Sequence, residues 1–269
     1  MNDYRLIALD IDGTLTNSQK KISPPTKEAL LEIQEQGYIV VIATGRPTGG
    51  VRDLADELEL DRFGSFVLSY NGGNITNWKT KEVIYRQELP KQTIPALHSF
   101  AVSKGIGIIT YENDSIVAGT DINKYKQLEA DITKLDIRKV DNFPEYINFP
   151  CTKCLISGEP EAVEAAEKEL KKHYNSLLNI FRSEPFFLEI MPKGIDKAHS
   201  LLKLLSSLGL TAEQMICCGD GFNDISMIEV AGLGVAMENA QDLVKEAADF
   251  VTKSNDDNGI LHVINKFMR

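Results

Sequence analysis

The chain has 269 residues, of which 43% are hydrophobic and 25% are charged, and its formal net charge is −10. This composition is typical of a globular protein with one large α/β domain or two smaller ones. The negative charge argues against a nucleic-acid partner, because phosphate contacts need a basic surface. With no apolar stretch of membrane-spanning length and no signal-peptide core at its start, the sequence predicts a cytoplasmic protein without a membrane partner. The oligomeric state cannot be inferred from it.

The two ends of the chain follow a regular strand and helix alternation. Near the N-terminus, strands are predicted over residues 5–9, 38–43 and 66–69, and helices over 24–36 and 48–60. Near the C-terminus, strands are predicted over residues 215–218, 233–237 and 250–252, and helices over 196–208, 224–231, 242–248 and 260–267. Continuous apolar strands indicate a mostly parallel, doubly wound sheet that is covered on both faces.

Between these ends the alternation is lost. Short β-prone runs (106–111, 115–118, 154–157 and 186–190) mix with helical patterns (90–104, 122–135 and 160–174), which indicates an α+β module. We therefore predict an α/β core formed by residues 1–83 and 189–269, with an inserted α+β domain formed by residues 84–188.

The first strand ends in Asp10-Ile11-Asp12-Gly13-Thr14. Residues two apart in a strand point to the same face, and Gly13 allows the backbone to turn. This pattern predicts two carboxylates at the carboxyl end of a strand, where open α/β sheets bind their ligands. A turn rich in aspartate is the simpler interpretation of the motif alone.

Two further strand ends carry polar residues. Thr44 and Gly45 follow the second strand, where a hydroxyl and backbone N–H groups can bind an oxyanion. Gly219-Asp220-Gly221-Phe222-Asn223-Asp224 follows the strand at 215–218. If Asp220 and Asp224 lie near Asp10, the cluster needs a hard cation, and oxygen ligands favour Mg²⁺.

Lys197 lies in the first turn of a predicted helix, where a cation opposes the helix dipole. This placement is a weak functional signal, and Lys193 is a competing candidate. The four cysteines, Cys151, Cys154, Cys217 and Cys218, are predicted to be buried free thiols. A zinc site is disfavoured, because adjacent strand residues face opposite sides of a sheet.

Together these motifs resemble the haloacid dehalogenase superfamily of phosphotransferases, over the whole chain. Asp10–Thr14, Thr44, Lys197 and Gly219–Asp224 match its four motifs in order. The insertion resembles the cap domain of the Cof-type branch, of which Tyr70-Asn71-Gly72 and Pro192-Lys193-Gly194 are typical. Arg182-Ser183, Phe187–Ile190 and Phe250–Asn255 look most like the bacterial sugar-phosphate phosphatases of that branch.

The resemblance implies a Mg²⁺-dependent phosphatase that hydrolyses small phosphorylated metabolites, sugar phosphates foremost, through an aspartyl-phosphate. Asp10 is the implied nucleophile and Asp12 the general acid and base, with Lys197 also catalytic. The implied metal ligands are Asp10, Asp12 and Asp220, with Asp224 in the outer shell or orienting Lys197. The implied phosphate-binding residues are Ile11, Thr44, Gly45, Lys197 and Asn223.

The inserted domain is expected to select the substrate, with Lys153, Arg182 and Glu189 as candidate contacts. An exposed, solvated cap surface is an alternative interpretation of these three residues. Two other functions stay open: a phosphomutase that uses the same aspartyl-phosphate, and a non-catalytic metabolite-binding protein of the same fold. The identity of the substrate, including flavin mononucleotide or pyridoxal phosphate, cannot be inferred from the motifs.

Overall fold

The computed structural model describes residues 3–269, which form two compact units. The first unit comprises the chain up to Gly45 together with residues 52–85 and 196–269, and the second comprises residues 46–51 and 86–195. Residues 46–51, expected in the core, fall in the second unit, and residues 84 and 85, expected in the insertion, fall in the first. Residues 189–195, expected in the core, lie in the second unit, because most of them belong to a strand that pairs within its sheet.

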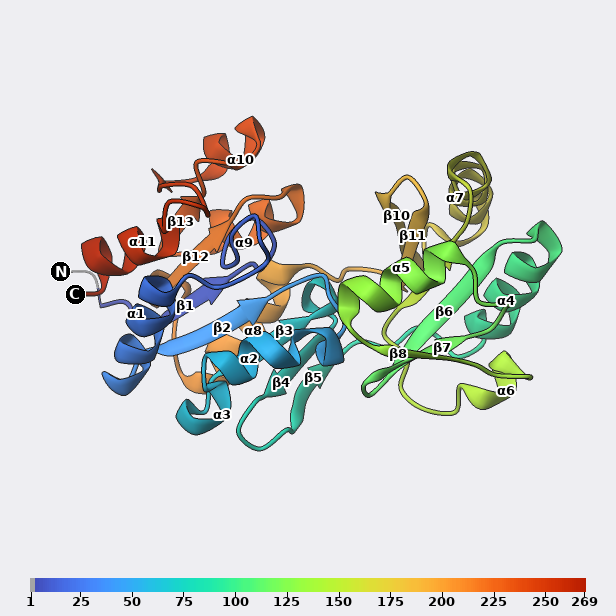
Figure 1. Ribbon diagram of the computed structural model, residues 1–269, viewed down its shortest axis with the longest axis horizontal. Helices are drawn as coiled ribbons and strands as arrows, with labels where there is room; N and C mark the ends of the chain where they lie inside the picture. The colour runs from blue at the N-terminus through green and yellow to red at the C-terminus, as the bar shows by residue number, and fades with distance from the viewer. Residues whose placement is uncertain (1–2) are drawn as a thin grey trace. The chain divides into compact units, whose positions relative to one another are not determined.

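The first unit contains an eight-stranded sheet in the order β14-β13-β12-β1-β2-β3-β4-β5 (Figure 1). Its strands are β1 (Leu6–Leu9), β2 (Ile39–Ala43), β3 (Phe66–Ser69), β4 (Asn74–Asn77), β5 (Val83–Arg86), β12 (Met215–Gly219), β13 (Leu233–Ala236) and β14 (Phe250–Val251). The six strands from β14 to β3 are parallel, and β4 pairs antiparallel with β3. The strand order reverses between β1 and β12, so their carboxyl ends lie at the topological switch point of the sheet.

Helices and short 3-10 turns connect these strands. The helices are α1 (Pro24–Glu35), α2 (Arg52–Glu57), α3 (Leu60–Phe63), α8 (Lys197–Leu208), α9 (Ile225–Val230), α10 (Asp242–Ala247) and α11 (Gly259–Phe267). The 3-10 turns of this unit are η2 (Tyr70–Gly72), η3 (Ala212–Gln214) and η4 (Phe222–Asp224). The single helix expected over residues 48–60 is divided into the 3-10 turn η1 (Thr48–Val51), α2 and α3. The break before α3 falls at Glu59, which has a left-handed backbone with φ +51°.

The core strands alternate their buried side chains between the two faces of the sheet. Leu6, Ala8 and Cys217 join a hydrophobic cluster with residues of α8 and α9. Their strand neighbours are equally buried but are not members of that cluster, as the twofold repeat of a strand requires. Cys217 and Cys218 therefore face opposite sides of the sheet, as predicted, and all four cysteines are buried and free.

The second unit contains a six-stranded sheet in the order β10-β11-β9-β6-β7-β8. Its strands are β6 (Gly107–Glu112), β7 (Ser115–Ala118), β8 (Asp136–Lys139), β9 (Cys154–Ser157), β10 (Leu178–Glu184) and β11 (Phe187–Pro192). Its helices are α4 (Thr93–Lys104), α5 (Lys124–Thr133), α6 (Phe143–Tyr146) and α7 (Pro160–Tyr174). Only β7 and β8 are parallel, so the sheet is of the predicted α+β kind.

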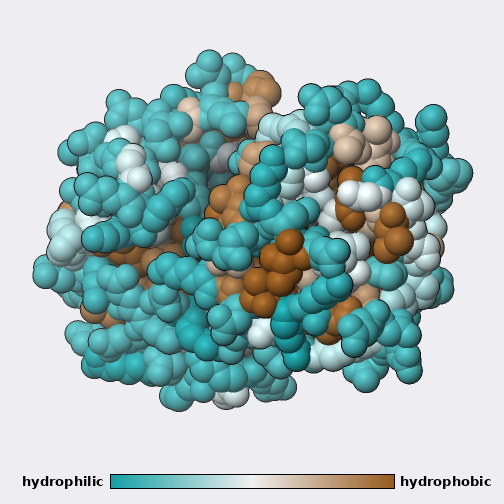
Figure 2. All heavy atoms as spheres, turned by 45° about the vertical axis from the view of Figure 1, so that its right-hand side comes forward, coloured by the Kyte–Doolittle hydropathy of each residue, from teal (hydrophilic) through white to brown (hydrophobic). Residues whose placement is uncertain are grey.

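The surface agrees with the charged composition of the chain. The face in Figure 2 is mostly hydrophilic and carries small, separate hydrophobic areas. Within residues 3–269, the helices are all too short or too polar to span a bilayer.

Candidate active site

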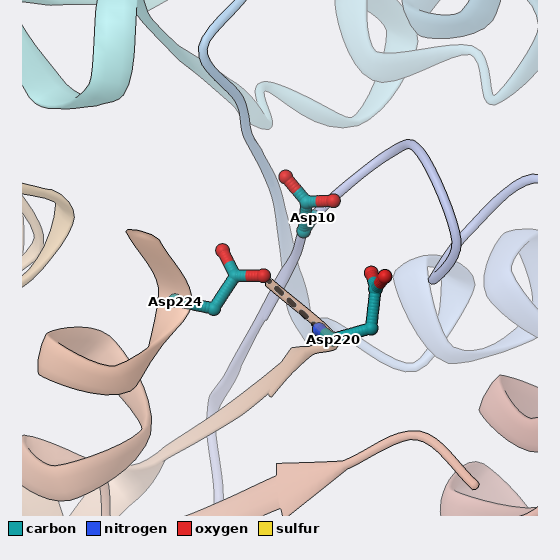
Figure 3. A group of neighbouring side chains, drawn as sticks. All are labelled: Asp10, Asp220 and Asp224. Carbon is teal, nitrogen blue, oxygen red and sulfur yellow. Dashed lines mark hydrogen bonds between the residues drawn. The ribbon is translucent and has the colours of Figure 1, made fainter. Parts of the chain in front are cut away.

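Three carboxylates meet where β1 and β12 end. Leu9 pairs with Cys218 across these strands, and the Asp10 N–H donates to the Cys218 carbonyl oxygen over 3.1 Å. This register places Asp10, at the end of β1, beside the segment that follows β12. Carboxylate oxygens of Asp10, Asp220 and Asp224 all lie within 4.8 Å of one another (Figure 3).

Lys197 lies inside this acidic group. Its side chain is fully buried, and its Nζ donates to Asp10 Oδ1 over 2.7 Å and to Asp224 Oδ1 over 2.6 Å. Burial opposes its charge, but the two carboxylates outweigh this effect and raise the pKa of Lys197 above its ordinary value. The ammonium therefore remains charged and neutralises part of the cluster. Lys193, the competing candidate, is exposed and lies in the second unit.

Asp224 holds its neighbours in place rather than facing solvent. Its Oδ2 accepts a hydrogen bond from the Asp220 N–H over 3.0 Å (Figure 3) and another from the Gly221 N–H over 2.9 Å. With its other oxygen on Lys197, both Asp224 oxygens are engaged by the protein. Asp224 thus orients the lysine and shapes the turn after β12.

The remaining carboxylates suit a cation. Burial, followed by the charge of Asp224, raises the pKa of Asp10 to about 7 even though Lys197 lowers it. Burial likewise raises the pKa of Asp220 to about 6, against a hydrogen bond from Thr14. A divalent ion would relieve this cost, and an all-oxygen donor set fits Mg²⁺. The residues present therefore fit the predicted metal.

The turn after β1 is packed closely against Asp220. Gly13 has φ +88°, and a Cβ there would lie 2.3 Å from Asp220 Oδ2. Asn239 Nδ2 donates to the Gly13 carbonyl over 2.8 Å, and Asn255 Nδ2 donates to the Thr16 carbonyl over 2.9 Å. No local pattern predicted these supports, because they join segments more than 200 residues apart.

Asp12 differs from Asp10 in its surroundings. Its side chain is 39% exposed, and its Oδ1 lies 2.8 Å from the Nζ of Lys20. The two aspartates of the motif therefore have separate environments, since Asp10 is buried against Lys197 and Asp12 is partly exposed against Lys20. No motif of the sequence predicted Lys20 as a neighbour of this site.

Asn71, which was not predicted as part of the site, connects Thr44 and Gly45 to Asn223. The Asn71 N–H donates to the Thr44 carbonyl over 2.8 Å, and Asn223 Nδ2 donates to Asn71 Oδ1 over 3.0 Å. The typical Tyr70-Asn71-Gly72 motif was the only sequence signal that could have identified this role for Asn71.

The candidate substrate contacts of the second unit have partners within that unit. Lys153 and Glu189 are buried, with Nζ and Oε2 2.9 Å apart, and Ser183 Oγ donates to Glu189 Oε1 over 3.0 Å. The Arg182 Nε donates to Glu167 Oε2 of α7 over 2.8 Å. Lys153 and Glu189 thus form one ion pair, whereas Arg182 pairs with a different carboxylate, that of Glu167.

Fold and site together define an α/β enzyme with an acidic centre at the switch point of its sheet. The family model described as haloacid dehalogenase-like hydrolase matches residues 7–264, and the chain belongs to this family.

Individual relatives span nearly the whole chain. A haloacid dehalogenase-like hydrolase from Bacteroides thetaiotaomicron is 48% identical, with a TM-score of 0.95 and coverage of 98% of this chain and 99% of that one. The HAD subclass IIB sugar phosphatase BT4131 is 30% identical, with a TM-score of 0.82 and coverage of 98% and 99%. The 5-amino-6-(5-phospho-D-ribitylamino)uracil phosphatase YcsE of Bacillus subtilis (strain 168) is 35% identical, covering 97% of this chain and 95% of its own. The predicted fold, family and enzyme class, a phosphoric monoester hydrolase, are thereby confirmed.

Proposed function

We propose that this protein is a Mg²⁺-dependent phosphatase that hydrolyses small phosphorylated metabolites, sugar phosphates foremost, through an aspartyl-phosphate. The observation that carries the proposal is the placement of Asp10. Its carboxylate is buried at the switch point of the sheet, in contact with a charged lysine and beside Asp220. An oxygen nucleophile beside cationic groups is what attack on a phosphate ester requires.

The first step forms the aspartyl-phosphate. An oxygen of Asp10 attacks the phosphorus, the bond from phosphorus to the alcohol oxygen breaks, and Asp12 gives its proton to that oxygen. In the second step Asp12 takes a proton from water, whose oxygen attacks the phosphorus and releases inorganic phosphate and free Asp10. The exposure of Asp12 supports this shuttle, because a proton carrier must reach both alcohol and water.

Asp10, Asp220 and the backbone carbonyl of Asp12 would hold Mg²⁺. When bound, the ion supplies charge that offsets the repulsion between carboxylate and phosphate. Asp224 supports this set indirectly, since its oxygens fix Lys197 and the backbone of Asp220. Ile11, Thr44, Gly45, Lys197 and Asn223 would bind the phosphoryl oxygens.

The choice of substrate rests on the relatives. BT4131 is described as a sugar phosphatase, and YcsE acts on a phosphorylated ribityl chain. Both names describe polyhydroxylated phosphate esters, which favours that class for this chain. Selection by Lys153, Arg182 and Glu189, and a cytoplasmic location, remain predictions.

Phosphate release from a panel of hexose, pentose and ribityl phosphates, with Mg²⁺ or EDTA, tests the proposal. We expect release with Mg²⁺ only, and none from Asp10→Asn, whereas Asp61→Asn on the exposed surface of α3 should leave the rate unchanged. If Asp10→Asn keeps the wild-type rate of phosphate release, Asp10 is not the nucleophile. An isomeric sugar phosphate without free phosphate would indicate the phosphomutase, and turnover of no substrate would indicate the binding protein.

A further inference from the structure

The turn after β3 has an unusual backbone. Tyr70 and Asn71 both have φ +53°, and Gly72 has φ +100°. A left-handed conformation is uncommon for a residue other than glycine, and for a bulky aromatic residue it is a true outlier. Such strain persists only where the surroundings hold it, and it clusters at functional sites. The contacts of η2 are therefore informative.

Asn71 contacts the loop after β2. Its backbone N–H donates to the Thr44 carbonyl over 2.8 Å. Its carboxamide lies against Gly45, where an added Cβ would be 3.2 Å from both Asn71 Oδ1 and Nδ2. The strained turn thus places the amide of Asn71 directly against the backbone that is proposed to bind phosphate.

Asn71 also contacts the loop after β12. Asn223 Nδ2 donates to Asn71 Oδ1 over 3.0 Å. A carboxamide nitrogen carries two hydrogens, so this bond occupies one and leaves the other available to an anion. Rotating the Asn223 carboxamide alone would place two oxygens together, so in this pairing the Asn71 oxygen keeps the amide nitrogen of Asn223 as the donor, and the reverse pairing needs both carboxamides to rotate together.

The turn is fixed on its third side by α8. Ser200 Oγ donates to the Gly72 carbonyl over 2.6 Å, and a Cβ on Gly72 would lie 2.4 Å from the Asp196 carbonyl oxygen. Asp196 immediately precedes Lys197, the cation on Asp10. The turn therefore contacts three of the four segments that carry the proposed phosphate-binding residues, and the fourth is the one that carries Ile11.

From this arrangement we infer that Asn71 is a positioning residue for phosphoryl transfer. It orients the Asn223 amide as a donor and sets the distance between that amide and the Thr44–Gly45 loop. Asn71 itself does not need to touch the substrate. This inference rests on the proposed phosphatase function.

Asn71→Gly is the decisive variant, because glycine accepts the left-handed backbone and keeps the N–H to Thr44 while removing the carboxamide. We expect kcat/KM to fall about 10- to 100-fold, as misplaced binding groups cause. The matched control is Asn258→Gly, another asparagine of the first unit with φ +57°. It should change kcat/KM less than about twofold, because the Asn258 carboxamide accepts from Ser23 at the start of α1 and not from a segment of the proposed site.

A double-mutant cycle gives a readout that a purely structural role would not affect. Asn223→Ala should reduce kcat/KM strongly in the wild type but by less than about threefold in Asn71→Gly, since the two residues act as a unit. Asn71→Asp retains an acceptor oxygen and tolerates the left-handed backbone. When Asn223→Ala is added to Asn71→Asp, kcat/KM should therefore fall strongly, as it does in the wild type.

The outcomes separate the inference from the function on which it rests. If the wild type releases no phosphate from any ester, the proposed function fails. If the wild type is active and Asn71→Gly matches it, or if the two substitutions multiply independently, Asn71 is not a positioning residue. If Asn71→Gly has a lower melting temperature but an unchanged kcat/KM, the turn contributes to stability alone.

Discussion

Lys197 Nζ lies 2.7 Å from Asp10 Oδ1 and 2.6 Å from Asp224 Oδ1, in a fully buried position. The ammonium thus neutralises a nucleophile candidate and the carboxylate that shapes the turn after β12. Removing one partner of a buried ion pair leaves an uncompensated charge, which is more costly than losing the pair as a whole.

For Lys197→Met we therefore expect the free energy of unfolding to fall by about 3 kcal/mol, as measured by urea denaturation. We also expect kcat to fall by about 100-fold or more, because an electrostatic contact to the transferring group is lost. Lys203→Met, an exposed position of the same helix, is the matched control. It should leave kcat unchanged, and the loss of its cation–π contact with the Tyr85 ring should lower the free energy of unfolding by no more than about 1 kcal/mol. Full stability in Lys197→Met would contradict the buried pairing.

Gly13 and Gly37 offer a second matched comparison. Their φ values are +88° and +92°, but a Cβ at Gly13 meets Asp220 at 2.3 Å while none of the described atoms lies within 4 Å at Gly37. Alanine at either position should cost about 1–2 kcal/mol of backbone strain. Only Gly13→Ala should also lose Mg²⁺-dependent kcat/KM, by about 100-fold, because Asp220 must move. Equal kcat/KM in the two variants would show that Asp220 tolerates the displacement.

Asp12→Asn tests the proton transfer. With p-nitrophenyl phosphate, whose leaving group needs little protonation, we expect a loss of about 10-fold, and with a sugar phosphate about 1,000-fold. The neighbouring variant Lys20→Met keeps the carboxyl group and should show no such dependence on the leaving group. The acid role of Asp12 is wrong if Asp12→Asn slows both substrates equally.

A buried lysine of the second unit predicts a pH effect on stability. Lys126 is 1% exposed and donates to the Asp121 carbonyl over 2.5 Å, and burial lowers its pKa to about 8 in spite of Asp121. Because this pKa is below the ordinary value of 10.5, the charged form destabilises the fold at neutral pH. The penalty is complete below about pH 8 and disappears as the pH rises towards 10.5.

The measurement compares the free energies of unfolding of the wild type and Lys126→Met between pH 7 and 10. As the pH rises, the free energy of unfolding of the wild type should increase relative to that of Lys126→Met by about 1–3 kcal/mol. Lys172→Met removes an exposed lysine of α7 and should show a constant difference. A constant difference for Lys126→Met as well would mean that the Lys126 side chain is solvated.

Much of the fold follows from local patterns. Continuous apolar runs predicted β1, β2 and β12, and Pro24 and Gly37 correctly delimit α1. The strands β4, β5, β8 and β10 were not predicted. Of these, β5 and β8 are mostly exposed, so their residues do not alternate between a buried and an exposed face. The division at Glu59 was missed for a related reason, since nothing in the residue type requires a left-handed backbone there.

The sequence by itself determined which acids stand at strand ends, since strand period and turn chemistry are local properties. It also determined the order of the motifs, and with it the family. Only the tertiary structure decided that Lys197 contacts Asp10 across 187 positions, that Asn71 joins Thr44 to Asn223, and that Lys153 is paired with Glu189. These contacts depend on strand order and on the register of distant segments, because the neighbours of a buried charge are set by packing rather than by adjacent residues.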